Sequence, residues 1–369
     1  MLLLLDTHTF IWWNLEPEKL STLIQTFSFE YFKKNMKTLT QFALMVIILT
    51  ISIGSSFAFT KTHLKVGYLP ILDHLTLLVS HAQDRCAFQQ VEIEPKMFKA
   101  WGEMVGALKA GVIDAAFMLS PLAMDLFNQK VDIKTILLAH RDGAAITVKS
   151  NQAIHSAADL RDKIIAIPDR KATHTALLNH YSRSAGISLK DVQTKVIAPP
   201  NMIKAMLLGK IDAFIVAEPF GTKAQYNGIG QILVLTKDII NHHVECVVVI
   251  HQRIIQENPQ AVQEWVDSLI RAGQWIEQDK LQNGSKKVAH LTSKTYYSHS
   301  EANIIRGLQN PPDRISFSDL KPVQQDFKII LDISVQSNII DKVNLEDFID
   351  DSFYRNHQIS INEERSKKN

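Results

Sequence analysis

Several side chains that bind small polar ligands stand where predicted strands lead into predicted helices. Asp73 and His74 follow one apolar strand, and Thr173 and His174 follow another. Free backbone N–H groups at the start of a helix favour anions, so these positions predict a site for a small anionic ligand. Asp73 and Thr173 would serve equally well as N-caps of their helices.

Two arginines and a tryptophan lie at comparable places in the predicted chain path. Arg170 could neutralise an anion, or it could be a solvated surface residue. Arg141 follows another strand and could bind a carboxylate or sulfonate, or could pair structurally with Asp142 or Asp73. Trp101 lies between a strand and a helix, where it could form an apolar wall of a binding cleft or pack in the core.

A fifteen-residue segment occurs twice and relates two further candidates. ALKAGVIDAAFMLSP at 107–121 recurs as AMLLGKIDAFIVAEP at 205–219, 98 residues later. The repeat aligns Ser120 with Glu218, so one copy has a hydroxyl where the other has a carboxylate. Glu218 would suit a ligand with an amine or ring N–H, or it could pair with Arg170 across the cleft.

Short apolar strands alternate with amphipathic helices from Lys61 onward, which gives each repeat a βαβαβ pattern with a parallel sheet. We expect an α/β fold of two Rossmann-like lobes, with a hinge and a central ligand cleft. Strands near 146–149 and 244–250 would connect the lobes. The predicted segments are 59–149 for the first part of lobe 1, 150–245 for lobe 2, 246–355 for the return to lobe 1 with C-terminal helices, and 356–369 for a polar, frayed tail.

Composition excludes some classes of protein. The 369 residues are 46% apolar and carry a net charge of +2, with no Lys/Arg run of five, so nucleic acid is not an expected partner. This length suits two ordinary domain cores. Cys86 and Cys246 could form a disulfide or remain free and buried.

The sequence contains no evident catalytic machinery. It shows no arrangement of nucleophile, base and orienting group, and no glycine-rich phosphate loop. His242 and His243 have no third ligand at a useful spacing for a metal, although His243 remains a candidate contact of the solute. We therefore expect binding without catalysis, metal or cofactor.

The first 58 residues are predicted to lie outside the mature fold. Residues 36–58 combine a short positive start, an apolar run from Leu39 to Ile53 and a small-x-small site, which together indicate a signal peptide cleaved after Ala58. An uncleaved membrane anchor is the alternative, but the apolar run is shorter than the roughly 20 residues that span a bilayer.

The segment 1–21, MLLLLDTHTFIWWNLEPEKLS, resembles the opening strand and helix of PIN-domain ribonuclease toxins. Asp6 would be the first metal-binding carboxylate of that family. A single carboxylate does not make a Mg²⁺ site, so we interpret residues 1–35 as a fused remnant or an overlong start, with Met36 as the true start.

The mature part resembles the type II periplasmic solute-binding proteins of ABC importers. KVGYLPILDH, FKAW, LKAGVIDAAFMLSPLAMDL, LLAHRDGAAITVK, AADLRDKIIAIP and GKIDAFIVAEPF carry the resemblance, which runs from about residue 62 to 355. It is similar to the branch that handles nitrate, sulfonates, taurine or bicarbonate, with thiamine-pyrimidine-binding relatives nearby. The chain departs from the nitrate and bicarbonate binders at ILDH (71–74) and NHHVEC (241–246).

This resemblance implies a periplasmic, monomeric binding protein that captures a small anionic solute. Its partners would be the permease and ATPase subunits of an importer at the inner membrane. A binder of a thiamine-precursor pyrimidine is the alternative ligand class, and a pyrimidine-synthase-like enzyme on the same fold is the alternative of another class. Such cytosolic enzymes would carry no signal peptide, so the implied protein is not an enzyme.

Overall fold

The computed structural model describes residues 60–368, and Lys61–Asn369 form one compact unit. The predictions for the PIN-like fragment with Asp6, for the signal peptide and for cleavage after Ala58 lie outside the described residues. Within the described part, no helix is both long enough and apolar enough to cross a membrane.

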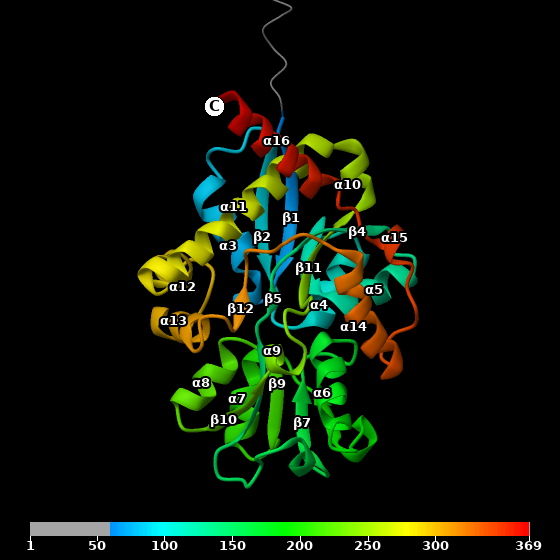
Figure 1. The fold of residues 1–369 in the computed structure, drawn as a ribbon, viewed down its shortest axis with the longest axis vertical. Helices are drawn as coiled ribbons and strands as arrows, with labels where there is room; N and C mark the ends of the chain where they lie inside the picture. The colour runs from blue at the N-terminus through cyan, green and yellow to red at the C-terminus, as the bar shows by residue number, and fades with distance from the viewer. Residues whose placement is uncertain (1–59, 369) are drawn as a thin grey trace, which may run out of the picture. The chain divides into compact units, whose positions relative to one another are not determined.

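Two five-stranded sheets form the framework of this unit (Figure 1). The strands of the first sheet are β1 (Thr62–Tyr68), β2 (Val91–Met97), β3 (Ala115–Leu119), β4 (Ile133–Leu138) and β11 (Cys246–His251). The strands of the second sheet are β6 (Ala144–Lys149), β7 (Ile164–Ile167), β8 (Gln193–Val196), β9 (Ala213–Ala217) and β10 (Gly230–Leu235). Their spatial orders are β2-β1-β3-β11-β4 and β10-β6-β9-β7-β8.

Helices accompany both sheets. Those between strands of the first sheet, or directly after β11, are α3 (Leu75–Asp84), α4 (Trp101–Lys109), α5 (Ser120–Asn128), α10 (Gln252–Glu257) and α11 (Pro259–Asn283), and the 3-10 turn η2 (Leu72–His74) precedes α3. Those of the second sheet are η3 (Ala157–Leu160), α6 (Thr173–Arg183), η4 (Leu189–Asp191), α7 (Pro199–Leu207), α8 (Phe220–Tyr226) and α9 (Thr236–Ile239). We call the first sheet with its helices lobe 1 and the second sheet with its helices lobe 2.

The two lobes are built alike, as the sequence repeat predicts. Val66 pairs with Ala115 in the first sheet, and Ile165 pairs with Ala213 in the second, all in parallel strands. An antiparallel strand completes each sheet, because β11 pairs with β3 and β6 pairs with β9. Each of these strands enters its sheet directly from the segment that crosses between the lobes.

The first crossing lies earlier in the chain than the sequence suggests. The predicted end of the first part of lobe 1 was residue 149, but β6 pairs with β9 and β10 in the second sheet. The crossing therefore precedes Ala144. The apolar run AAITV is buried in either assignment, so hydrophobicity alone does not tell which sheet a crossing strand joins.

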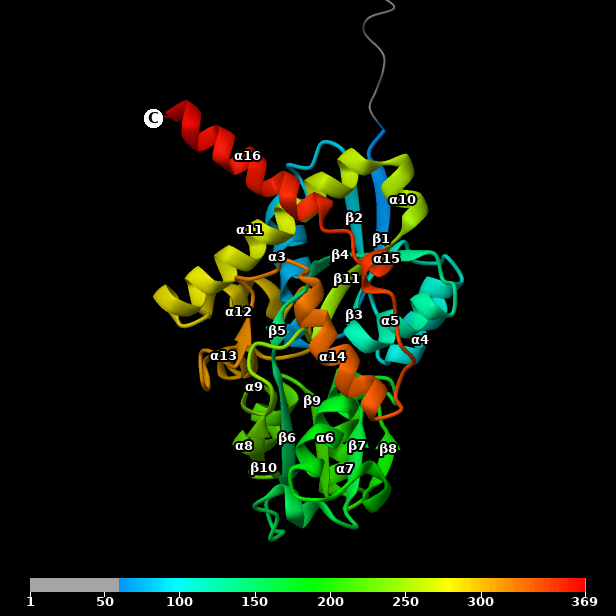
Figure 2. The ribbon, with the colours of Figure 1, turned by 45° about the vertical axis from the view of Figure 1, so that its right-hand side comes forward.

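The C-terminal segment packs on both lobes. Its elements are α12 (Lys286–Ser293), α13 (Glu301–Gln309), β12 (Ile315–Ser316), α14 (Gln324–Gln336), α15 (Leu345–Phe348) and α16 (Ser352–Lys368). Helix α11 packs on α3 of lobe 1, whereas α14 contacts both α5 and α6 and α13 contacts α8 (Figure 2). The return segment therefore ties the two lobes together from outside.

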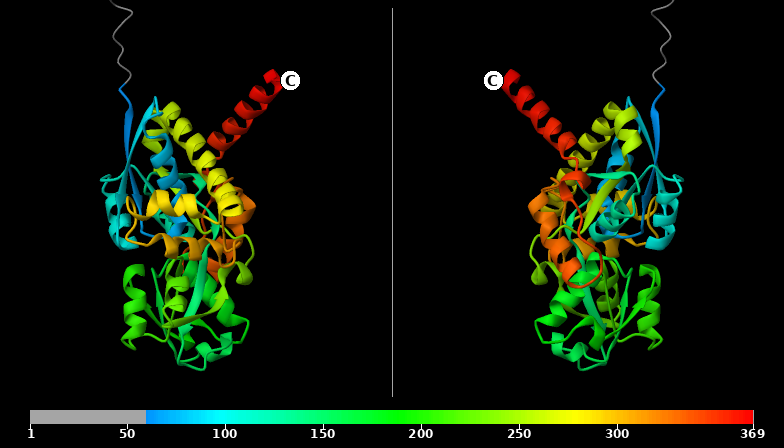
Figure 3. Two further views of the ribbon diagram at one scale, coloured as in Figure 1. Left: turned by 90° about the vertical axis from the view of Figure 1, so that its left-hand side faces the viewer. Right: turned by 90° about the vertical axis from the view of Figure 1, so that its right-hand side faces the viewer.

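The predicted frayed tail is wrong in its conformation. Residues 352–368 form helix α16, which packs on α11 near its start and then extends away from the sheets (Figure 3). Its sequence is mostly polar, but Phe353 near its start is buried in the core, and Arg355 pairs with Asp351 at helical spacing, with 3.3 Å between the charged atoms. Such i,i+4 pairs support a solvent-exposed helix.

Candidate functional site

Two antiparallel segments carry the chain between the lobes, and we call them the hinge segments, 139–143 and 242–246. Arg141 and Val244 form an antiparallel bridge. The N–H of Asp142 donates to the carbonyl of His243 (3.1 Å), and the N–H of Ala139 donates to the carbonyl of Cys246 (2.9 Å). These paired segments lead into β6 and β11, so any ligand between the lobes would lie against them.

The repeat also determines how the lobes meet the hinge segments. The N–H of Ser120 donates to the carbonyl of Glu245 (2.9 Å), and the N–H of the equivalent Glu218 donates to the carbonyl of Gly143 (3.0 Å). The residue that follows the repeated strand of each lobe, β3 or β9, is therefore hydrogen-bonded to one hinge segment. Gly143 adopts a φ of +106°, which favours glycine.

A set of buried polar side chains surrounds the hinge segments, and we call it the hinge cluster. It contains three types of potential ligand group, namely imidazole, carboxylate and thiol. Every member is at most 3% exposed. The members are Asp73, His140, His174, His243, Glu245 and Cys246.

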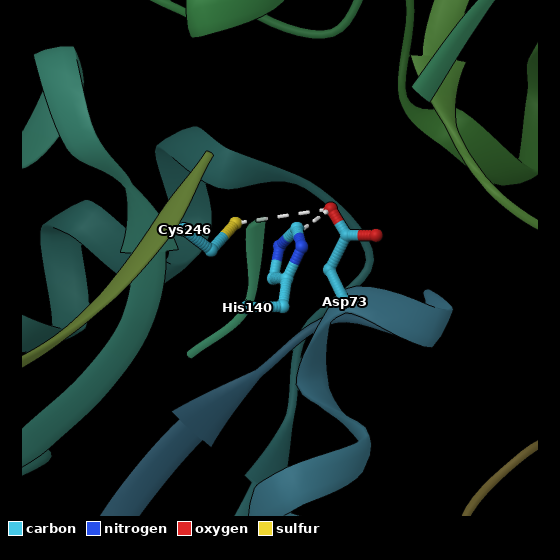
Figure 4. Close-up of side chains that lie close together, drawn as sticks. All are labelled: Asp73, His140 and Cys246. Carbon is cyan, nitrogen blue, oxygen red and sulfur yellow. Dashed lines mark hydrogen bonds and ion pairs between the residues drawn. The ribbon is translucent and has the colours of Figure 1, made fainter. Parts of the chain in front are cut away.

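Three members converge on a small volume (Figure 4). Asp73 Oδ2 lies 3.2 Å from His140 Nε2 and 3.8 Å from Cys246 Sγ. Asp73 is on η2 of lobe 1, and the other two are on different hinge segments. The tertiary fold thus brings together residues that are more than 60 positions apart in the sequence.

The other members form a second, contiguous group. His243 Nε2 is 2.8 Å from Glu245 Oε2, and His243 Nδ1 is 2.8 Å from Asp142 Oδ1. The second oxygen of Glu245, Oε1, lies 3.4 Å from Nδ1 of His174, which comes from the first turn of α6 in lobe 2. This group therefore links a hinge segment to lobe 2.

Many polar atoms of the hinge cluster are not satisfied by the protein. Among the described residues, both ring nitrogens of His140 and of His174 have no hydrogen-bond partner, and neither do Asp73 Oδ1 and Glu245 Oε1. His140 Nε2 approaches Asp73 at 3.2 Å without hydrogen-bond geometry. Unpaired buried polar groups are costly, and carboxylate oxygens lie 3.2 Å from His140 and 3.4 Å from His174, so the cluster is a candidate ligand site.

Burial disfavours the charged form of each ionisable group in the cluster, but neighbouring charges and hydrogen bonds outweigh its effect on the pKa of His140, His243 and Glu245. Burial raises the pKa of Asp73, against the opposing effect of His140, and it lowers the pKa of His174 despite Glu245. Burial also acts to lower the pKa of His243, but hydrogen bonds to Asp142 and Glu245 outweigh it and raise that pKa to about 10. His243 is therefore a cation at neutral pH.

Arg141 is buried but fully engaged by the protein. Its Nη2 is 2.7 Å from Asp326 and 3.0 Å from Asp319, and its other nitrogens donate to the carbonyls of Asp319 and His242, both at 3.1 Å. The predicted alternatives were a ligand anion or a pair with Asp142 or Asp73. The guanidinium instead anchors the C-terminal segment to a hinge segment.

Both predicted N-caps are wrong. Asp73 lies inside η2, whose N-cap is Ile71, and its carboxylate faces the hinge cluster. Thr173 is the first residue of α6 after the N-cap Ala172, and its hydroxyl donates to the carbonyl of Glu245 at 3.4 Å. Each residue thus contacts a hinge segment rather than its own helix start.

Trp101 packs in the core of lobe 1 and forms no cleft wall. It is 1% exposed and stands edge-on to His74, with 5.8 Å between the ring centroids. His74 is itself buried, and its Nδ1 accepts from the N–H of Leu69 at 2.9 Å. Both side chains therefore pack behind η2, and His74 Nε2 and Trp101 Nε1 have no hydrogen-bond partner among the described residues.

Glu218 has a partner that the sequence did not suggest. Its Oε1 lies 2.7 Å from Nη1 of Arg314, and its Oε2 accepts from the N–H of Thr222 at 3.0 Å. The expected partner, Arg170, is exposed in the turn before α6. The hydroxyl of Ser120 is buried and directed to the carbonyl of Val244 at 3.5 Å.

Sequence reasoning missed His140, Glu245, Cys246 and Arg314. The sequence left the two cysteines as either a disulfide or free and buried. Both are free, with Cys246 buried and Cys86 exposed. One signal was available, because 241–246 is one of the two segments that depart from the nitrate and bicarbonate binders. The other, 71–74, contains Asp73.

Two surface hollows lie away from the hinge cluster. One of about 420 Å³ is bordered by η4 and by the end of α14, and one of about 570 Å³ lies between α14 and α15. Neither is lined by a member of the hinge cluster. The polar residues that could hold a ligand are therefore enclosed rather than open to solvent.

The two matched lobes, the crossing hinge segments and the enclosed cluster define the type II periplasmic binding-protein fold. The model of the NMT1-like family matches residues 58–292, more than half of the chain, so this chain belongs to that family.

Curated relatives are transport proteins. The nitrate/nitrite binding protein NrtA of Nostoc sp. is 26% identical over 266 residues, which are 66% of this chain and 60% of that protein. The nitrate import ATP-binding protein NrtC of Synechococcus elongatus is 26% identical over 260 residues, 65% of this chain and 39% of that protein. The chain thus spans less than two thirds of the length of these relatives.

Solved structures share the fold. The nitrate-binding protein NrtA of Synechocystis superposes with a TM-score of 0.74 at 16% identity, covering 81% of this chain and 89% of that one. A zinc-bound ligand-binding component of an ABC-type import system from Staphylococcus aureus gives 0.72 at 22% identity, covering 80% and 98%. The desulfurization enzyme DSZB gives 0.61 at 15% identity, covering 81% and 99%.

Proposed function

We propose that this chain is the solute-binding component of an ABC importer and captures a small anionic solute between its two lobes. The observation that carries the proposal is the enclosed, unsatisfied hinge cluster at the place where two equivalent lobes join. Such lobes can close by bending of the connecting segments. The closed form would deliver its solute to a permease.

The anionic class of solute rests on the relatives and on one local feature. The curated relatives are named for nitrate/nitrite binding or bicarbonate transport. In this chain, α6 begins beside the cluster, and the start of a helix favours anions. The buried cations contribute little to anion binding, because His243 and both buried arginines are paired with carboxylates.

Binding without catalysis fits the chemistry of the cluster. Cys246 is the cysteine of the cluster. Burial raises the pKa of its thiol well above the ordinary value, and the charge of Asp73 raises it further. A nucleophilic cysteine needs a lowered pKa. The fold shared with DSZB therefore does not by itself argue for an enzyme.

The partners and the compartment follow from the same proposal. A permease and an ATPase would complete the importer, in line with the ATP-binding relative NrtC. The chain would act in the periplasm as a monomer after removal of its signal peptide. Intact mass of the protein in a periplasmic fraction should then begin at Phe59, and recovery with Met1 in place would contradict export.

A thermal-shift screen tests the proposed function. The chain is heated with nitrate, bicarbonate, alkanesulfonates, taurine or a hydroxymethylpyrimidine after treatment with a chelator. A specific ligand at 100 times its dissociation constant should add about 2.7 kcal/mol of stability. His174→Gln should reduce the shift, whereas His290→Gln, at an exposed histidine, should not. The absence of a shift with every anion would overturn the anionic class, and a shift with the pyrimidine alone would replace it.

A further inference from the structure

Asp73, His140 and Cys246 together have the composition of a transition-metal site. Each offers one ligand atom, and these three atoms all lie within 4.8 Å of one another. Imidazole and thiolate bind zinc and similar ions, whereas Ca²⁺ and Mg²⁺ take oxygen ligands almost alone. The chemistry of this set therefore favours a zinc-like cation over a hard cation.

Two of the three edges of the site can be compared with such an ion, and the third, between His140 and Cys246, is within 4.8 Å. For metal–nitrogen and metal–oxygen bonds of about 2.05 Å and a metal–sulfur bond of about 2.3 Å, a tetrahedral site has an O–N edge of about 3.3 Å and an O–S edge of about 3.5 Å. The observed edges from Asp73 Oδ2 are 3.2 Å to His140 and 3.8 Å to Cys246. The three side chains point toward one another from separate elements (Figure 4).

Burial supplies independent support. Asp73, His140 and Cys246 are each 0% exposed, and the nitrogens of His140 have no hydrogen-bond partner among the described residues. The Cys246 thiol donates to Asp73 Oδ2 at 3.8 Å and His140 lies 3.2 Å from the same oxygen, so all three groups converge on one buried point. A coordinated cation satisfies all three with one atom.

We propose that this chain binds one zinc-like transition-metal cation through Asp73 Oδ2, His140 Nε2 and Cys246 Sγ. Three protein ligands leave the fourth position of a tetrahedral ion open. This open position could take water or a solute atom. An ion held in this way joins lobe 1 to both hinge segments.

Cobalt spectroscopy of the full chain tests this site, because the chain has two free cysteines in different surroundings. Co²⁺ added to chelator-treated protein should give a thiolate-to-cobalt charge-transfer band that saturates at one equivalent. Cys246→Ser should remove the band, and Cys86→Ser, which changes the exposed cysteine, should retain it. Circular dichroism of both variants checks that they fold. Loss of the band in Cys86→Ser, or its retention in Cys246→Ser, overturns the proposal.

A competition experiment on the unmodified chain does not depend on how the variants fold. Zinc binds nitrogen and sulfur ligands more tightly than cobalt does, so one equivalent of Zn²⁺ should abolish the cobalt band. Failure of Zn²⁺ to displace Co²⁺, or the absence of any cobalt band, contradicts the site. The solute screen uses metal-free protein, so failure of the metal site would leave the importer proposal standing, and the reverse also holds.

Discussion

The buried ion pair between Glu218 and Arg314 gives a quantitative test of how the lobes are held. Arg314 is 3% exposed and Glu218 is 0% exposed, with 2.7 Å between Nη1 and Oε1. The pair joins lobe 2 to the C-terminal segment, and Arg314 Nη1 also donates to the hydroxyl of Thr222. Replacing Arg314 by methionine leaves the side-chain volume largely filled but strands the carboxylate.

The expected cost of Arg314→Met follows from this stranded charge. Removal of one partner of a buried ion pair destabilises a protein by about 3–5 kcal/mol. The N–H of Thr222 still donates to Glu218 Oε2 at 3.0 Å, so we expect the lower end of this range. The double variant Glu218→Gln/Arg314→Met should recover part of the loss, because it removes the buried charge.

Urea denaturation followed by circular dichroism measures these free energies of unfolding. Arg161→Met is the matched control, since Arg161 pairs with Asp191 on the surface and should cost at most about 1 kcal/mol. Equal stability losses in Arg314→Met and Arg161→Met would refute the reasoning. Unchanged stability with abolished solute binding would show instead that Glu218 is a ligand contact.

Four further substitutions test packing and ionisation. Trp101→Ala should lower the free energy of unfolding by about 3–5 kcal/mol in urea denaturation, because the side chain is in the core; a loss below 1 kcal/mol would place it at a cleft. Gly273→Ala should lower the free energy of unfolding by about 1–3 kcal/mol, since a Cβ there would clash with the carbonyl oxygen of Phe317. Gly102→Ala is the control and should be neutral or slightly stabilising, because a Cβ at that position meets nothing within 4 Å. Burial, and then Tyr296, raises the pKa of Tyr68 from 10.0 to about 12, so its contribution to stability is present below pH 10 and is lost as the pH rises through about 12. The melting temperature of Tyr68→Phe should fall less steeply with rising pH over this range than that of the wild type. Parallel plots of melting temperature against pH would contradict the raised pKa.

The repeat made much of the fold predictable. Ala115 and Ala213 stand at the same place in the two copies, and both begin the third strand of a parallel βαβαβ unit. The glycines that follow the second helix of each βαβαβ unit, Gly111 and Gly209, adopt φ values of +67° and +66°. Local patterns of this kind depend on neighbouring residues, and the sequence displays them directly.

The site was less predictable because its contacts are not local. Asp73, His174 and His243 were identified as candidates, yet the roles first considered for them were helix capping and anion binding. Arg141 pairs with Asp319 and Asp326, and Glu218 pairs with Arg314, all across long stretches of chain. The sequence does not indicate which carboxylate a buried arginine will contact, because the partners are brought together only by the tertiary fold.

The distance between the lobes with and without solute tests the central claim most directly. Cys86 is an exposed cysteine of lobe 1, and Lys210→Cys adds one on the exposed surface of lobe 2, while Cys246 is buried and protected from labelling. Spin labels at the two exposed positions report the distance between the lobes by pulsed electron paramagnetic resonance. If a solute is captured between the lobes, a saturating anion should shorten and narrow the distance distribution. An unchanged distribution under saturating binding would contradict capture between the lobes.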